Sequence, residues 1–239
     1  MTFVLVAALY LAWTLPYFHA VWATVIGNNR LTAEEINAAL GMAGQSIFTI
    51  QPDEVETRLR LNYHELTSAE VKVYLPNYVY VTVTEREPVI LWQQGDGYTW
   101  VDSAGVAFRP RGFVAGLVPV VGNGTPPVEV VSADDPLSPP PFISKEMVDA
   151  ILVLAPHVPA GSYMLYDPHN GLGWNDSRGW QVYFGTDTKD MALKVRVYQS
   201  LVDSLMARGL YPTFVSVAYP DAPYYRMAQL NIEANSDGE

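Results

Sequence analysis

The residue types that most often carry catalysis or bind metal ions are scattered in this sequence. No two histidines have the spacing that places two imidazoles on one metal ion. The four histidines are His19, His64, His157 and His169. Adjacent carboxylates such as Glu34 and Glu35 point in different directions and do not converge on one bond. We therefore expect no metal ion and no catalytic residue.

One Gly-rich segment gathers several polar side chains, namely Asp167, His169, Asn170 and Asp176. Such side chains can surround a cation, but Asp and Asn in loops more often hydrogen-bond to their own backbone, so we interpret the segment as turns. Gly171-Leu172-Gly173 lacks the third glycine and the strand-to-helix setting of a dinucleotide loop. Neither a Gly-Lys-Ser/Thr phosphate loop nor a Gly-x-Ser-x-Gly elbow occurs. The sequence predicts no cofactor, no small-molecule substrate and no enzyme.

The charge balance argues against nucleic-acid binding. The chain has 239 residues, with 14 Lys+Arg against 25 Asp+Glu, and a formal net charge of -11. A net negative charge does not favour binding to phosphate backbones or anionic lipid surfaces. With no cysteine there is no disulfide and no thiolate ligand. A hydrophobic content of 49% over this length allows one or two globular domains.

The N-terminal segment is typical of a membrane anchor. No charged residue precedes Arg30, and residues 3–13 form an unbroken apolar run. A helix over residues 1–16 is roughly 24 Å long, short of the roughly 30 Å hydrocarbon core, and no basic residue precedes it. We expect residues 1–17 to be part of a single membrane anchor that begins upstream of this sequence, with the rest outside the cytoplasm. A cleavable signal peptide and a buried helix are the alternatives.

Residues 18–87 have the pattern of a compact α+β unit. A strand over 19–26 precedes a helix that begins with a capping box at Thr32. Pro52 begins a second helix, whose apolar positions are Val55, Leu59 and Leu61. Apolar residues then alternate on both sides of Pro76-Asn77, which predicts a hairpin with one buried face. The inward residues of this hairpin are Val71, Val73, Val79, Val81 and Val83.

Residues 88–232 have a β-rich pattern of short strands and turns. The longest helix is expected over 188–207, where apolar residues recur at helical spacing. Segments 213–219 and 225–232 are expected to form a closing antiparallel pair. The polar tail over 233–239 is expected to be disordered. The predicted fold is α+β, with the second domain built on an antiparallel sheet with flanking helices.

The order of these segments resembles the FtsQ/DivIB family of bacterial cell-division proteins. The most distinctive stretch is residues 76–89, Pro-Asn-Tyr-Val-Tyr-Val-Thr-Val-Thr-Glu-Arg-Glu-Pro-Val, which follows a strand ending in Val25-Ile26-Gly27-Asn28. Further segments similar to the family are residues 101–108, 117–122 and 179–185. The resemblance covers essentially the whole chain. It implies a partial membrane anchor (1–17), a polypeptide-transport-associated (POTRA) domain (18–87) and a β-domain (88–232).

The resemblance also implies a function. Members of this family are non-catalytic scaffolds of the division complex at the cell membrane, where they link FtsB- and FtsL-like partners to septal peptidoglycan synthesis. An exposed closing strand suits such a role, because its free N–H and C=O groups can pair with an added strand. The expected partner-binding residues are Tyr219, Tyr225, Arg226, Met227, Ala228, Gln229 and Leu230.

One departure from the family pattern concerns this site. Before Tyr219 the chain has Val215-Ser216-Val217-Ala218, where family members commonly carry an acidic residue and an arginine. Contacts made by that arginine therefore cannot be carried over. The helix surface around Lys194 and Tyr198 is the alternative partner surface. The alternative functions are a POTRA-containing export or envelope adaptor and an unrecognised extracytoplasmic enzyme.

Overall fold

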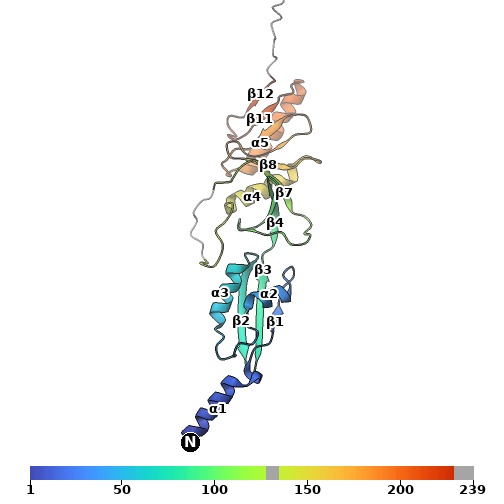
Figure 1. Cartoon of the computed structure of the whole chain (residues 1–239). Helices are drawn as coiled ribbons and strands as arrows, with labels where there is room; N and C mark the ends of the chain where they lie inside the picture. The colour runs from blue at the N-terminus through green and yellow to red at the C-terminus, as the bar shows by residue number, and fades with distance from the viewer. Residues whose placement is uncertain (128–134, 229–239) are drawn as a thin grey trace, which may run out of the picture. The chain divides into compact units, whose positions relative to one another are not determined.

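The computed structural model describes residues 1–127 and 135–228, and the chain divides into two compact units (Figure 1). The first unit comprises residues 1–88, residues 106–114 and a third stretch that ends at Pro140. The second unit comprises the remaining segments. Each unit has its own hydrophobic core.

The first unit holds a sheet whose described strands have the order β1-β3-β2. Strand β1 runs parallel to β3, and β2 pairs antiparallel with β3. Helices α2 and α3 lie beside this sheet (Figure 1). The elements are α1 (Thr2–Thr14), the 3-10 helix η1 (Pro16–Phe18), β1 (Ala23–Ile26), α2 (Ala33–Leu40), α3 (Pro52–Asn62), β2 (Leu66–Tyr74) and β3 (Tyr78–Glu85). The expected α+β unit is therefore present, although its first strand begins four residues later than predicted.

Local sequence signals explain these elements. The Thr32 hydroxyl accepts from the backbone N–H of Glu35 at 3.1 Å, and the Glu35 carboxylate accepts from the N–H of Thr32, which completes the expected capping box. The expected valines do face the core: four are buried with the apolar residues of α2 and α3, and Val73 packs partly buried beside them. Leu61 does not join them, because it lies on the solvent side of α3 and is 61% exposed.

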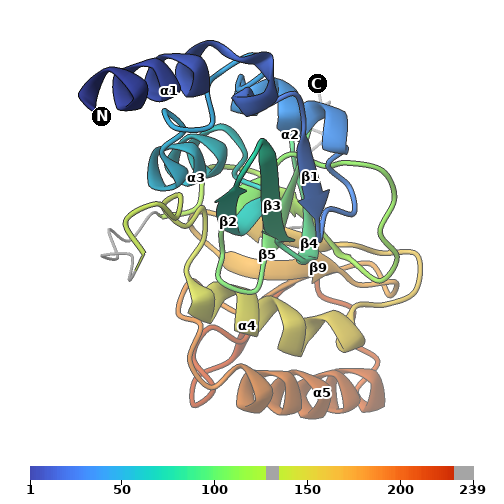
Figure 2. The same ribbon diagram turned by 90° about the horizontal axis from the view of Figure 1, so that it is seen from below.

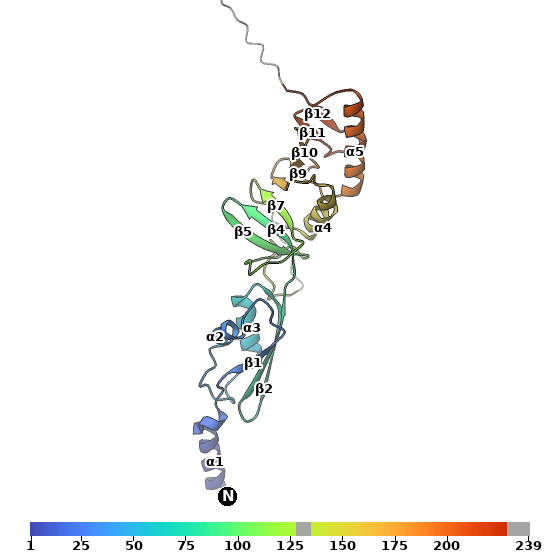
Figure 3. The same ribbon diagram turned by 90° about the vertical axis from the view of Figure 1, so that its right-hand side faces the viewer.

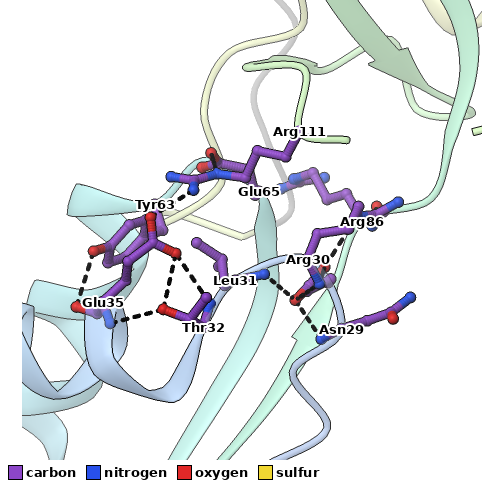
Figure 4. A network of polar contacts seen from close by, with 10 residues as sticks. Asn29, Arg30, Leu31, Thr32, Glu35, Tyr63, Glu65, Arg86 and Arg111 are labelled. Carbon is purple, nitrogen blue, oxygen red and sulfur yellow. Dashed lines mark hydrogen bonds and ion pairs between the residues drawn. The ribbon is translucent and has the colours of Figure 1, made fainter. Parts of the chain in front are cut away.

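A network of polar contacts joins the loop before α2 to the end of β3 (Figure 4). The Glu85 carboxylate accepts hydrogen bonds from the backbone N–H groups of Asn29, Arg30 and Leu31 at 2.7, 2.9 and 3.0 Å. Burial raises the pKa of Glu85, but these hydrogen bonds and the one from the Arg30 side chain outweigh burial, so its pKa lies below the usual value. The charged Glu85 carboxylate therefore joins the loop before α2 to this end of the sheet.

Helix α1 is apolar along its whole length, as the sequence predicts. It leads into η1, where Phe18 packs against Phe48 with ring centroids 5.5 Å apart. Within residues 1–127 and 135–228, no helix combines the length and the apolar character needed to cross a bilayer.

A larger sheet has nine described strands in the order β12-β11-β10-β9-β8-β7-β4-β5-β6, and all of them except β6 belong essentially to the second unit. Its strands are β4 (Pro88–Gln94), β5 (Gly97–Asp102), β6 (Ala107–Phe108), β7 (Val118–Gly122), β8 (Met164–Asp167), β9 (Gly171–Asn175), β10 (Gln181–Tyr183), β11 (Phe214–Ser216) and β12 (Tyr224–Arg226). The helices are α4 (Lys145–Leu154), the 3-10 helix η2 (Ala155–His157) and α5 (Met191–Ala207). Helices α4 and α5 lie side by side and pack on one face of the sheet (Figures 2 and 3).

The larger sheet is mixed, so the predicted antiparallel sheet was wrong in this respect. Three strand pairs are parallel: β4 with β7, β7 with β8, and β10 with β11. A parallel pair needs a crossover, and α5 supplies the crossover between β10 and β11. The other two parallel connections come from pairing between strands that are distant in the sequence, which periodicity alone does not reveal.

Strand β9 lies where turns were predicted, and its glycines explain the difference. A Cβ atom on Gly173 would lie 2.1 Å from the carbonyl oxygen of Val182 on the neighbouring strand. Gly171 has a φ of 79°, and a Cβ there would lie 1.8 Å from the carbonyl oxygen of Gly185. These glycines permit close packing of backbones within the sheet and do not mark a loop.

Candidate partner-binding edge

The expected partner-binding residues lie at the end of the larger sheet that β12 forms. Strand β12 pairs antiparallel with β11, with Val215 opposite Tyr225 and Ser216 opposite Tyr224. Among the described strands, β12 has a neighbour on one side only. Its outer side therefore presents backbone donors and acceptors in the arrangement that an added strand requires.

The hydrogen bonds of β12 show which backbone groups face outward. The carbonyl of Arg226 accepts from the N–H of Thr213 at 2.8 Å, so the backbone of Arg226 faces β11. Backbone groups of successive residues in a strand point to opposite sides. The N–H and C=O of Tyr225 therefore face away from β11. Strand β12 ends at Arg226, and extending it by one residue would turn the N–H and C=O of Met227 outward as well.

The side chains of β12 divide between the two faces of the sheet. Tyr225 is half-buried and packs against the main core. Tyr224 and Arg226 are exposed on the opposite face. There Tyr224 lies beside Phe214 of β11, with ring centroids 6.0 Å apart, and Phe214 stacks on Tyr183 of β10 at 5.8 Å. An aromatic row thus crosses three strands and ends at the open edge.

Arg226 covers the outer part of this aromatic row. Its guanidinium carbon lies 5.0 Å from the ring centroid of Phe214 and 5.6 Å from that of Tyr224. Such cation–π contacts hold the guanidinium beside the rings and leave its N–H groups able to bind a carboxylate or carbonyl. At the inner end of the row, burial raises the pKa of Tyr183, so its phenol stays neutral. The edge combines backbone pairing groups, aromatic surface and one positive charge.

The remaining expected residues lie elsewhere. Tyr219 was expected on the strand next to β12, but β11 ends at Ser216 and Tyr219 lies in the following turn, where its carbonyl accepts from the N–H of Ala222 at 3.0 Å. Tyr219 is 73% exposed. Met227 and Ala228 directly follow β12. Gln229, Leu230 and the tail over 233–239 lie outside the described residues.

On the alternative helix surface, Lys194 and Tyr198 themselves are not accessible to a partner, because they are buried at 3% and 5% exposure. The ammonium of Lys194 donates to the carbonyl oxygens of Phe184 and Asp187 at 2.9 and 2.6 Å. Helical spacing placed both residues on α5 correctly. It did not reveal that the loop after β10 covers Lys194.

The sequence pattern also did not reveal a buried polar cluster between the β9–β10 turn and α5. Tyr198 donates to the Asp176 carboxylate at 2.6 Å, and the indole N–H of Trp180 donates to the Tyr198 oxygen at 3.1 Å. Arg178 binds both carboxylate oxygens of Asp176, at 2.7 and 2.9 Å. Burial raises the pKa of Asp176, but these hydrogen bonds outweigh burial and hold the pKa below its usual value. The cluster joins the β9–β10 turn to α5.

Within residues 1–127 and 135–228, no group of three or more His, Asp or Glu side chains is placed to hold a metal ion. A hollow of about 240 Å³ lies beside β1 and α2, and its lining is mostly small and apolar, with Glu34 and Asn37 as its polar side chains. A lone carboxylate and an amide do not form an acid–base pair.

Comparisons with known proteins bear on the first unit. Residues 24–86 match the family model of the POTRA domain, FtsQ-type. The chain is 32% identical over 83 residues to the cell division protein FtsQ of Streptomyces venezuelae, a match that covers 34% of this chain and 31% of that protein. It is 33% identical over 79 residues to FtsQ of Streptomyces griseus, covering 33% of this chain and 38% of the relative.

A third comparison gives the same result. The chain is 30% identical over 86 residues to FtsQ of Streptomyces coelicolor, covering 36% of this chain and 33% of that protein. The chain thus spans about a third of the length of the curated relatives it matches. Together with the sheet and the two helices of the first unit, these matches confirm the resemblance drawn from the sequence: residues 24–86 form a POTRA domain of the FtsQ type, and the chain is similar to the FtsQ cell-division proteins.

Proposed function

We propose that this chain is a non-catalytic, single-pass membrane scaffold of the bacterial division complex. Its bulk would lie outside the cytoplasm at the division site, where it links FtsB- and FtsL-like partners to septal peptidoglycan synthesis. The FtsQ-type POTRA domain and the relatives named cell division protein FtsQ support this assignment. The apolar helix α1, which is exposed along much of its length, supports the membrane location.

The observation that carries the partner-binding part of the proposal is the open edge of β12. An added strand would bond to the outward backbone groups of Tyr225 and Met227, which offer two donors and two acceptors. At about 0.5–1.5 kcal/mol net per hydrogen bond, four bonds contribute about 2–6 kcal/mol. A micromolar complex requires about 8 kcal/mol. Exposed side chains of the edge, above all Tyr224 and Met227, must therefore supply the remainder.

Proline substitutions test strand addition, because proline removes one backbone N–H and leaves the rest of the strand in place. The measurement is the affinity of the full chain, in nanodiscs, for a synthetic peptide from the FtsB-like protein of the same genome. Met227→Pro should weaken binding at least about tenfold, which corresponds to about 1.4 kcal/mol. Ala228→Pro should weaken it less, because the N–H of Ala228 faces the side of β11.

Two controls make this test interpretable. Arg226→Ala keeps every backbone hydrogen bond and removes only the side chain beyond Cβ, so it should cost less affinity than Met227→Pro. Circular dichroism must show that each variant stays folded. If both folded proline variants bind like the parent, strand addition at β12 is refuted, and the shallow groove beside Leu193 and Pro223 becomes the surface to examine.

A further inference from the structure

One end of the POTRA domain carries α1 and also the tip of the β2–β3 hairpin. The parallel register pairs Ala23, at the start of β1, with Val79, close to the start of β3. The antiparallel register pairs Tyr74 with Tyr78 across the hairpin tip. Since the chain enters β1 from η1, the hairpin tip and the end of α1 lie at the same end of the sheet (Figure 3).

Large apolar and aromatic side chains cover this end. Each is more than half exposed. We call this surface the aromatic base, and it consists of Tyr17, Trp22, Phe48, Tyr74, Leu75 and Tyr78. Phe48 belongs to it because the N–H of Ile47 donates to the carbonyl of Phe18 at 2.8 Å, which fixes the Phe48 turn beside η1. The connection into β1, the Phe48 turn and the hairpin tip thus all contribute exposed apolar side chains to this end of the domain.

The six residues of the aromatic base are uncharged, although Trp22 lines one hollow together with Glu34. Residues 1–29, 36–52 and 73–84 contain no Asp, Glu, Lys or Arg. The nearest charged side chain along β2, Lys72, pairs with Glu70 at 2.9 Å. A cluster of charged residues lies at the opposite end of the sheet, where Glu85 ends β3 and Arg111 binds Glu35 and Glu65 (Figure 4). The domain is therefore polarised along its strands.

We propose that the aromatic base rests in the membrane–water interface, with the β2–β3 hairpin tip and the Phe48 turn inserted among the lipid headgroups next to α1. Trp and Tyr concentrate at this depth because their rings are amphipathic. A large exposed apolar patch that continues an apolar helix is best covered by the same lipid that surrounds the helix. The surface is uncharged, so its lipid contact does not require anionic headgroups.

This inference rests on the membrane location proposed above and is independent of strand addition at β12. Its geometry can be measured, because the chain has no cysteine and single labels can be introduced on an unlabelled background. Tyr78 and Thr84 provide a matched pair, since both are exposed and lie on the same face of β3. Six residues separate them, about 20 Å along the strand, whereas the headgroup region of one leaflet is only about 5–8 Å thick.

The experiment places the full chain in phosphatidylcholine vesicles, with a fluorophore on Leu11→Cys, Phe48→Cys, Tyr78→Cys or Thr84→Cys. Quenching by lipids that carry a nitroxide near the headgroup is then measured. We expect labels at positions 48 and 78 to be quenched several-fold more than the label at 84. Replacing a third of the lipid with phosphatidylglycerol should leave this ratio unchanged.

The other outcomes of this experiment would overturn the proposal. If the label at position 11 is quenched while those at 48 and 78 behave like the label at 84, the aromatic base does not contact lipid. If the label at 11 is not quenched, the membrane location fails, and this inference fails with it. Equal quenching at 78 and 84 would mean that the domain lies flat on the bilayer, which also overturns the proposal. Circular dichroism of each labelled chain verifies that the domain is folded.

Discussion

A charge placed on the inner face of β3 should unfold the POTRA domain. Val81 is fully buried, with Val25 and Val71 as its partners on the neighbouring strands. Val81→Asp removes apolar burial worth about 1.5–3 kcal/mol. A buried carboxylate without a partner costs about 3–5 kcal/mol more. The total, about 5–8 kcal/mol, matches or exceeds the stability of a small domain, which begins at about 5 kcal/mol.

Amide hydrogen exchange followed by mass spectrometry localises the effect within the full chain. In Val81→Asp, peptides from β2 and β3 should exchange as in an unfolded chain. The matched control is Thr84→Asp, which adds the same charge to the same strand at an exposed position. That change should stay within about 0.5 kcal/mol of the parent.

Two results would refute this reasoning. Slow exchange of β3 in Val81→Asp would mean that the inner face of the strand is not packed as described. Equal destabilisation by Thr84→Asp would mean that the strand tolerates no charge on either face, so the effect at Val81 would say nothing about burial.

The remaining predictions concern the two buried carboxylates. Tyr198→Phe should lower the free energy of unfolding by about 2–4 kcal/mol in urea denaturation, because the charged Asp176 and the indole of Trp180 each lose a buried hydrogen bond. A loss under about 0.5 kcal/mol would contradict the cluster's role. Glu85→Gln should cost about 1–3 kcal/mol, because the charge that binds Arg30 and three backbone N–H groups is removed, and a thermal melt equal to the parent's would contradict this. The folded-state pKa values of Asp176 and Glu85 lie below their ordinary values, so the stability that they contribute is complete above about pH 4–4.5 and is lost as the pH falls through the folded-state pKa. Asp176→Asn should reduce the fall in melting temperature with decreasing pH, in melts recorded from pH 2 to 7. An unchanged pH dependence would mean that other groups cause the loss of stability in acid.

Elements with a strong local signal could be predicted from the sequence. The β2–β3 hairpin alternates strictly, and only one of its faces can meet the two helices, so its buried valines follow from the pattern. Helix α2 is fixed by its capping box at Thr32 and by Gly41, whose left-handed conformation ends the helix. These signals lie within a few residues of the structure that they specify.

Features that depend on distant partners could not be predicted. Glycine is typical of turns, and only the close approach of Val182 from the neighbouring strand explains why Gly173 lies in a strand. Asp176 was interpreted as a turn residue, and it does accept a hydrogen bond from the backbone of Arg178, but its buried contact with Tyr198 crosses from the sheet to α5. At the candidate site, the pattern placed a strand at Tyr225, but this strand ends at Arg226 and does not include Met227 or Ala228 as expected. The position of Tyr219 depended on where β11 ends.

The most direct test of the central claim is the exchange rate of individual backbone amides at the edge of the larger sheet. It is measured by NMR on the full chain in nanodiscs, with and without the FtsB-like peptide. Strand addition predicts that the amides of Tyr225 and Met227, which would pair with the added strand, exchange more slowly when the peptide is bound. The amide of Arg226, which faces β11, should change little. Peptide binding that leaves the amides of Tyr225 and Met227 unprotected would contradict the claim that this chain recruits its partner through the open edge of β12.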